Sequence, residues 1–450
     1  MTAFIPPTVS PPHSPLGVIG SLRAVRRNVL SILPAIAYTQ PIVSGTTGPA
    51  RWHMVQSPES MRRVFLDNHA NYPKSEVMIR MLRPAVGRSL FTASGAHWRW
   101  QRRAIAPVFA ARNIDALAPF MTATARRCSA ALAAQDGPQA IVSAMLGATF
   151  DVICEVALSG RDSFDSARYG AAITRYFLTV GRASLLDFLK VPSWFPRPAE
   201  LAGAGAVRTM HKMVSAAIER RRRAAPGPTR DLLDHMMEAR DPDSGQTMSP
   251  RDLLHNMQFF IVAGHETTAL ALSWALLMLA HDPPTQERAA ATARARLQGR
   301  TASARDLAAL PEIDAILQET MRLYPPVGLL ARDVLSADRI HDREIRPGDT
   351  VFLNIYGLHR HRLYWRAPEL FRPGRFAPEK RAARDRYLHL PFGAGPRICV
   401  GANFAMLQAG IILASLLARF RFSPAPPLPE PVMHMTIRPE PEIFLHVEPR

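Results

Sequence analysis

The stretch FGAGPRICVG, Phe392 to Gly401, carries more structural information than any other segment of this 450-residue chain. Gly393 and Gly395 allow the backbone to turn tightly and to pass close to a flat ligand. A loop of this kind can aim backbone N–H groups at the sulfur of Cys399, which stabilises a thiolate. Arg397 adds a permanent positive charge that suits a carboxylate. The stretch therefore predicts a metal-ligating thiolate beside an anionic group.

A thiolate, a closely approaching backbone and an arginine together suit a haem, with iron on the sulfur and propionates on the arginine. The pattern F-x-x-G-x-R-x-C-x-G resembles the haem-binding signature of the cytochrome P-450 superfamily of haem-thiolate monooxygenases. Its five fixed positions are matched by Phe392, Gly395, Arg397, Cys399 and Gly401. The resemblance implies haem b (iron protoporphyrin IX), with Cys399 as the axial iron ligand. The competing interpretation is a buried, inert cysteine in a loop, and three further motifs argue against it.

Residues 250–281 form the longest apolar helical pattern and predict a buried central helix. The pattern begins after Ser249 with a proline at its first position, which is a helix-start signal. It ends at the run Asp282-Pro283-Pro284. The resemblance implies that a haem lies buried between this helix and the cysteine loop.

The middle of this helix reads AGHETT and places Glu266 and Thr267 among apolar neighbours. A buried carboxylate is costly unless it has a partner or a purpose, and a threonine can bond the i−4 carbonyl and bend the helix. The two residues resemble the family's acid–alcohol pair, which implies that they deliver protons during oxygen activation. Ala263 and Gly264 match the family's small residues that face oxygen, and a glycine there would let a ligand approach the helix.

Two other interpretations of AGHETT were weighed. One is a capping or solvent-facing polar cluster in a long helix. The other is the zinc motif HExxH, which His265 and Glu266 begin, but the fifth position is Ala269 and not histidine. A zinc peptidase is therefore excluded, and we expect His265 to be a bystander on the helix surface.

A third motif is Glu319-Thr-Met-Arg322, followed by Tyr-Pro-Pro. Residues three apart share one helical face and can pair, although a surface pair of this kind would contribute little. The motif resembles the family's E-x-x-R pair, and the later segment FRPGRF supplies Arg375 in the position that completes the family's triad. The resemblance implies a structural role for Glu319, Arg322 and Arg375, in which they hold the cysteine loop.

A fourth motif, Trp98-Arg-Trp-Gln-Arg102, places an indole N–H and a guanidinium four residues apart on one predicted helix. Both groups are donors that could reach one propionate, although an amphipathic helix with exposed arginines has the same pattern. The motif resembles the family's W-x-x-x-R, which implies propionate contacts for Trp98 and Arg102. Arg332 matches another propionate contact of the family.

The remaining pattern predicts a mainly helical chain with a small β region, in one domain over residues 1–450, with a Pro-rich extension at 1–19. Hydrophobic residues make up 47% and charged residues 20%, which is ordinary for a globular protein. We expect an irregular segment at 72–95 and a mostly helical region over 96–240. Shorter helices are expected at 20–33, 284–298, 311–323 and 402–420, and strands within 41–56, 327–355 and the last thirty residues.

The formal net charge of +18 comes almost wholly from arginine, since only four lysines occur. Such a charge could serve nucleic acid, an acidic protein, or reflect a compositional bias. No nucleic-acid motif accompanies the scattered arginines, so we favour docking of an acidic ferredoxin or flavodoxin. Three cysteines without a CxxC pair exclude a disulfide framework and indicate a reducing cytosol. We expect no membrane span, a cytoplasmic location as in soluble bacterial members of the family, and a monomer.

The resemblance implies hydroxylation or epoxidation of an apolar molecule with O2. The glycines of the cysteine loop do not form a dinucleotide fingerprint, so electrons must come from a separate protein. A peroxide-using haem-thiolate enzyme and a haem-binding sensor are the alternatives, and the Glu266–Thr267 pair argues against both. Candidate residues of the substrate pocket, most of which could equally be core, are Val77, Met78, Met81, Leu82, Phe259, Phe260, Val327, Leu329, Leu330, Met435 and Thr436.

Overall fold

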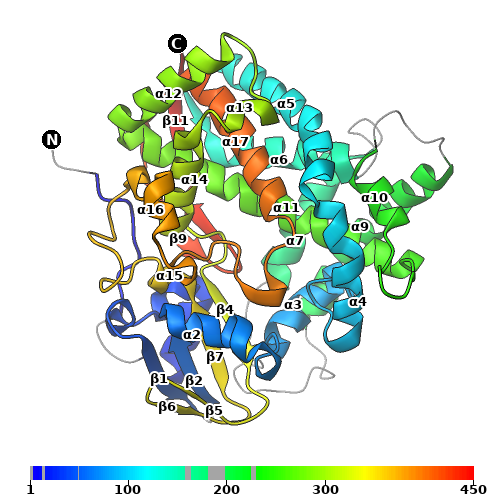
Figure 1. Ribbon diagram of the computed structural model, residues 1–450, viewed down its shortest axis with the longest axis vertical. Coiled ribbons are helices and arrows are strands. Elements are labelled where there is room, and N and C mark those ends of the chain that lie inside the picture. The colour runs from blue at the N-terminus through cyan, green and yellow to red at the C-terminus, as the bar shows by residue number, and fades with distance from the viewer. Residues whose placement is uncertain (1–3, 13–15, 49, 158–163, 181–197, 224–229) are drawn as a thin grey trace.

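The computed structural model describes residues 4–12, 16–48, 50–157, 164–180, 198–223 and 230–450. It is mainly helical, as expected, and its largest sheet lies below the helices in Figure 1. The longer helices are α1 (Val18–Arg27), α3 (Glu76–Val86), α4 (Gly95–Ile105), α5 (Ala111–Ala133), α6 (Ile141–Ala157), α7 (Ser166–Thr179), α9 (Pro198–Arg223), α10 (Leu232–Glu238), α11 (Pro250–His281), α12 (Pro283–Leu297), α14 (Pro311–Leu323) and α17 (Ala402–Arg419). The shorter ones are α2 (Pro58–Arg62), α13 (Ala304–Leu307), α15 (Ile355–Leu358) and α16 (Pro378–Ala382).

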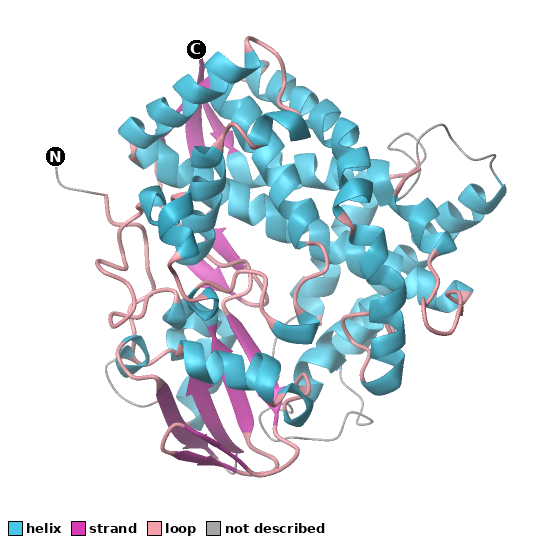
Figure 2. Cartoon of the chain, in the orientation of Figure 1, coloured by secondary structure: helices cyan, strands magenta, loops and turns pink. Residues whose placement is uncertain are grey.

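The strands of the described residues form small, separate sheets, drawn in magenta in Figure 2. The largest has the order β1-β2-β7-β4, in which β2 and β7 are parallel and the other pairs antiparallel. A second has the order β3-β11-β8, and β5–β6 and β9–β10 are paired strands. Strands occur in each of the three predicted regions. Their bounds are β1 (Ile42–Thr47), β2 (Ala50–Val55), β3 (Pro138–Ala140), β4 (Leu329–Asp333), β5 (Asp338–Ile340), β6 (Arg343–Ile345), β7 (Thr350–Asn354), β8 (Phe420–Pro424), β9 (Glu430–Met433), β10 (Ile437–Glu440) and β11 (Phe444–Pro449).

Helix α11 runs through the middle of the helical body (Figure 1) and has the predicted bounds. Its first turn is closed by Ser249, whose side-chain oxygen accepts a hydrogen bond from the Asp252 N–H at 3.1 Å. Most of the helix is buried, and Trp274 is fully buried within the large hydrophobic core. This helix is therefore a rigid platform for the residues in its middle.

Two helices, α11 and α17, are long and apolar enough to cross a membrane, although we expected no such segment. Their most apolar windows are 72% and 61% buried inside the fold. A core helix of a globular protein has the same length and composition, so these two helices are weak support for a membrane span.

The segment 72–95 was expected to be irregular, and this prediction was wrong because it contains α3. The Asp333 carboxylate accepts a hydrogen bond from the Glu76 N–H at 2.9 Å, so a distant strand caps the helix. Leu82 and Val86 are buried against the core, even though Pro84 interrupts the helical bonding. Tertiary packing thus outweighs the breaker signals of the sequence.

The helix expected at 20–33 stops earlier, because α1 ends at Arg27 and Asn28 follows as its C-cap. The Asn28 side chain accepts a hydrogen bond from the Leu30 N–H at 3.0 Å and donates one to the Pro431 carbonyl at 2.9 Å. Short polar side chains of this kind compete with helical bonding. Two short 3₁₀ turns, Val29–Ile32 and Ala35–Tyr38, follow.

The N-terminal extension lies on the helical body where it is described, and residues 1–3 and 13–15 are outside the described residues. The Phe4 ring stacks on His281 at the end of α11, with 3.9 Å between centroids. The Tyr324 hydroxyl donates a hydrogen bond to the Pro7 carbonyl at 2.8 Å. Residues 4–12 therefore cover the ends of α11 and α14.

Candidate active site at the cysteine loop and the central helix

The cysteine loop makes the tight turns that its glycines predicted. Gly393 and Gly395 have φ values of +71° and +68°, which other residues rarely adopt. A Cβ atom on Gly395 would lie 1.9 Å from the Phe65 carbonyl oxygen, so this glycine allows close approach to protein backbone. The N–H of Cys399 donates to the Phe392 carbonyl at 3.0 Å, which closes the loop. Contact of the loop with a flat ligand stays a prediction.

Cys399 is the exposed cysteine, whereas Cys128 and Cys154 are buried in the core as expected. The protein atoms around the Cys399 sulfur raise the pKa of the thiol by desolvation. The Gly401 N–H, which bonds the sulfur, and the positive charge of Arg102 act in the opposite direction. A bound metal ion would provide the remaining stabilisation of a thiolate.

Next to the loop lies a cluster of cations. The Arg397 guanidinium lies over the Trp98 ring, 4.2 Å from its centroid, and donates to the Ala93 carbonyl at 3.1 Å. Arg332 is 5% exposed, and its Nη1 donates to the carbonyl of Ala331. Burial lowers the pKa of Arg332 and of Arg397 to about 10, and the neighbouring charge of Arg397 adds to the effect on Arg332.

Lys74 belongs to the same cluster, and the sequence analysis missed it. Its Nζ donates to the Phe91 carbonyl at 2.8 Å and lies 3.5 Å from the centroid of the Phe91 ring. Burial, followed by the charges of Arg397 and Arg332, lowers the pKa of Lys74 well below its usual value. The only signal in the sequence was that Lys74 is one of four lysines in an arginine-rich chain.

No ion pair joins Lys74, Arg102, Arg332 or Arg397 to a carboxylate of the described residues. Burial also lowers the pKa of Arg102. Such a set of desolvated cations is unfavourable unless an anionic group neutralises it. The cluster therefore fits the two carboxylates of a haem. Arg397 contacts Trp98 and neighbours Arg332, and Arg102 neighbours Cys399, whereas the propionate contacts of these residues stay a prediction.

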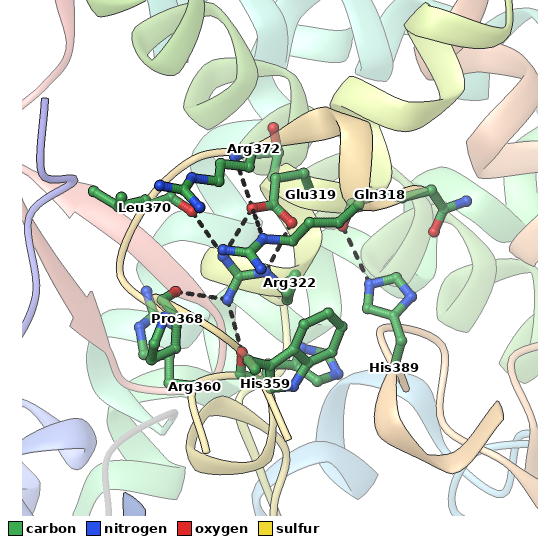
Figure 3. Close-up of polar contacts among 12 residues, drawn as sticks. Gln318, Glu319, Arg322, His359, Arg360, Pro368, Leu370, Arg372 and His389 are labelled. Atoms are coloured by element: carbon green, nitrogen blue, oxygen red, sulfur yellow. Dashed lines mark hydrogen bonds and ion pairs between the residues drawn. The ribbon is translucent and has the colours of Figure 1, made fainter. Parts of the chain in front are cut away.

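The predicted triad of Glu319, Arg322 and Arg375 is present, with Glu319 and Arg322 (Figure 3) buried and Arg375 partly exposed. Arg322 donates two parallel hydrogen bonds to the Glu319 carboxylate, both at 2.8 Å. Arg375 Nε donates to Glu319 Oε1 at 3.2 Å. The alternative interpretation, a weak surface pair, therefore does not apply, since the Glu319 and Arg322 side chains are both 0% exposed.

The triad also fastens the chain that leads into the cysteine loop. The remaining Arg322 donors bond the carbonyls of His359, Pro368 and Leu370 at 2.7–3.1 Å. The Leu390 N–H donates to His359 Nε2 at 2.8 Å, two positions before Phe392 (Figure 3 shows His359). The loop thus starts from a position fixed by a buried ion pair.

Glu266 and Thr267 of α11 have different hydrogen-bond partners. Thr267 Oγ1 donates to the Ala263 carbonyl at 2.8 Å, the i−4 bond that the sequence analysis considered. Glu266 is buried, and its Oε1 accepts a hydrogen bond from Thr436 Oγ1 at 3.1 Å and forms an ion pair with Arg438. Thr436, expected in the substrate pocket, thus contacts the acid, and Arg438 was missed altogether.

Gly264 and His265 both face helix α6. A Cβ atom on Gly264 would lie 3.0 Å from Ile153 Cδ1, so close helix packing accounts for this glycine, and its contact with oxygen stays a prediction. The His265 ring meets the Phe150 ring edge-on, with 5.2 Å between centroids. Burial lowers the pKa of His265 to about 4, so it is neutral at pH 7. The expectation that His265 lies on the helix surface was wrong.

The candidate pocket residues fall into two groups. Leu82, Phe260 and Leu329 are buried members of the large core, and Leu330 packs against the smaller cluster around the β1-β2-β7-β4 sheet. Core packing accounts for these four. The others are half-buried: Val77, Met78, Met81, Phe259, Val327, Met435 and Thr436. Contact of this second group with a substrate stays a prediction.

Comparisons with known proteins agree with this geometry. A family model described as Cytochrome P450 matches residues 9–447. Human Cytochrome P450 4F12 is 30% identical over 430 residues, covering 87% of this chain and 79% of that protein. Cyclooctatin synthase from Streptomyces melanosporofaciens is 27% identical, with 98% and 94% covered. The solved cytochrome P450DA heme domain has the same fold, with a TM-score of 0.84, 24% identity, and 99% and 98% covered. This chain therefore belongs to the cytochrome P450 family, whose members are oxidoreductases and monooxygenases.

Proposed function

We propose that the chain inserts one oxygen atom of O2 into a C–H or C=C bond of an apolar organic substrate, with electrons from a separate redox protein. The observation that carries the proposal is the Cys399 thiol beside cations that form no ion pair with a carboxylate of the described residues, in a fold whose central helix carries an acid–alcohol pair. The family implies a haem-thiolate cofactor, and we propose haem b, whose two propionates match this charge. When bound, the haem supplies the chemistry of oxygen activation.

The residues of this chain have separable tasks in that reaction. Cys399 would provide the axial thiolate, and Trp98 with the cation cluster would bind the propionates. The Glu266 carboxylate would accept a proton from solvent and pass it on, and Thr267 would orient that proton through its hydroxyl. Phe259 and the half-buried methionines would exclude water from the substrate.

Replacing Thr267 by alanine tests the proposed use of O2. The variant is expected to consume electrons at a rate near that of the wild type but to release most of them as peroxide, because the proton is no longer delivered in place. The matched control is Thr268→Ala, which removes a buried hydroxyl of the same helix that has no partner among the described residues. Product formed per electron pair is the measurement, with oxygen-isotope incorporation into the product. Normal coupling in Thr267→Ala, or efficient turnover with peroxide alone, would favour the peroxide-using alternative.

Lys74→Met tests the cation cluster directly. In the haem-free protein the substitution is expected to raise stability, because it removes a desolvated amine from beside Arg332 and Arg397. In the haem-loaded protein it is expected to speed haem loss, because one propionate partner is gone. Thermal unfolding of the haem-free form and transfer of haem to a scavenger protein measure the two effects. Arg83→Met, at an exposed position of α3, should change neither, and equal behaviour of the two variants would contradict the assignment.

We propose an acidic ferredoxin as the electron donor, docked beside the cysteine loop. A surface groove of about 550 Å³ lies there and is lined by Arg381, Arg386 and Ile398, the last 42% exposed. Exposed arginines beside apolar lining residues suit a transient acidic partner. A cytoplasmic monomer is consistent with this mode of electron supply.

Arg386→Glu is expected to raise the KM for an acidic ferredoxin several-fold and to weaken its dependence on salt, with the substrate-induced spectrum unchanged. Charge reversal opposes the encounter without touching the haem side. The control is Arg208→Glu on α9, which makes the same change in net charge at an exposed position away from the groove. An equal effect of both variants would point to net charge alone and not to this groove.

A further inference from the structure

The Glu266 carboxylate is held from outside its own helix. Thr436 Oγ1 and an Arg438 Nη atom both donate to Glu266 Oε1, and no described residue donates to Oε2. Thr436 and Arg438 come from β10 and the turn that precedes it, more than 160 positions later in the chain. Glu266 Oε1 is thus fixed by the hairpin that β9 and β10 form. Oε2 is left for water or a reacting group.

The hairpin does not need this ion pair to stay in place. The Ile437 N–H donates to the Pro326 carbonyl at 2.9 Å, and Trp274 Nε1 donates to the Ile437 carbonyl at 3.3 Å. On the partner strand, the Met433 N–H donates to Asn28 Oδ1 at 3.0 Å. Ile437 is 0% exposed. The hairpin would therefore keep its position without the Glu266–Arg438 ion pair. We infer that the pair acts chiefly on the Glu266 carboxylate.

The Glu266–Arg438 ion pair also provides a counter-charge for the carboxylate. The Glu266 side chain is 11% exposed and that of Arg438 is 41% exposed. The other titratable neighbour is His265, which is neutral, so Arg438 is the counter-charge that the described residues offer. A desolvated carboxylate without a counter-charge takes up a proton. The guanidinium of Arg438 has donors and no acceptor, so it can hold the carboxylate but cannot act as a relay.

We propose that Arg438 is a positioning residue for proton delivery, which supplies the counter-charge of the Glu266 carboxylate and fixes one of its oxygens. Through its hydrogen bond to Glu266, Thr436 links the turn between β9 and β10 to the same carboxylate. Because Met435 and Thr436 are also candidate substrate contacts, a substrate that displaces this turn would alter the acid. The inference rests on the proposed function for its catalytic meaning, but the ionisation of Glu266 can be measured without turnover.

The test is infrared difference spectroscopy at pH 7 on the haem-free and haem-loaded protein, in four variants. Arg438→Met is expected to show a new carboxylic-acid C=O band, which a second change, Glu266→Gln, removes. Arg438→Lys keeps the charge and should show no band. Asn28→Ala loosens the hairpin without touching the charge, so it should lower the melting temperature and also show no band. Absence of the band in Arg438→Met, or its presence in Asn28→Ala, would overturn the proposal.

Turnover supplies the second readout. Arg438→Met should lose coupling several-fold with little change in the KM for substrate, and Arg438→Lys should restore most of it. A purely structural role would lower the amount of folded enzyme and leave coupling per folded enzyme unchanged, which would overturn the assignment. If Thr267→Ala also couples normally, the proposed function fails, whereas the infrared result for Glu266 still stands or falls by itself.

Discussion

Cys399→Ala is expected to abolish turnover and to remove the spectral signature of thiolate ligation, in particular the red-shifted main band of the reduced carbon monoxide complex. Alanine offers no metal ligand, and no other cysteine lies in this loop. Since Cys399 is exposed, the free energy of unfolding of the haem-free chain should change by no more than about 0.5 kcal/mol. Loss of function without loss of the fold is the expected combination.

The matched controls are Cys128→Ala and Cys154→Ala. Both cysteines are buried in the core, so each substitution should cost about 1 kcal/mol of stability and leave the haem spectrum intact. The spectrum of purified, haem-loaded protein and its equilibrium unfolding in denaturant are the measurements. A thiolate spectrum that persists in Cys399→Ala, or vanishes in either control, would contradict the assignment of the axial ligand.

Glu319→Gln is expected to be the most destabilising conservative substitution in the chain. It leaves the fully buried charge of Arg322, and the partly exposed charge of Arg375, without their carboxylate, and breaking such a buried pair costs about 3–5 kcal/mol. The backbone N–H of Arg372 also loses the charge of its acceptor, Glu319 Oε1, at 2.8 Å. Because Arg322 holds the carbonyls of residues 359–370, the variant should also bind haem poorly.

An exposed ion pair of the same chemistry serves as the control. Arg230 donates to both oxygens of Glu238 at 2.5 and 2.6 Å, and both side chains are more than half exposed. Glu238→Gln should therefore cost at most about 1 kcal/mol. Unfolding in denaturant of both variants measures the difference. Equal costs would mean that burial does not set the strength of the triad.

The parts of the site that depend on local sequence could be predicted. A few consecutive residues contain each of three motifs: the cysteine loop, Glu319 with Arg322, and Glu266 with Thr267. Arg375 could be assigned to the triad from the short segment FRPGRF. The bounds of α11 were also predictable, because Ser249 and Pro250 start it and a proline pair follows it.

The parts that depend on tertiary contacts could not be predicted. Lys74 joins the cation cluster only because its strand bridge places it beside Arg332. Arg438 reaches Glu266 from the C-terminal hairpin, and no local pattern marks either residue. Helix α3 forms across Pro84 because Asp333 caps it and the core buries one face. In each case a distant residue decides what the local pattern leaves open.

The hydrogen bonds of Asn28 have a consequence for biosynthesis. This side chain bonds the carbonyl of Pro431, 403 positions later, and accepts from Met433. Translation proceeds from the N-terminus, so Asn28 is synthesised long before its hydrogen-bond partners, Pro431 and Met433. Pairings of such large sequence separation form slowly. The helices in the middle of the chain can thus pack first. Glu266 of α11 can pair with Arg438 only after the last strands have been synthesised.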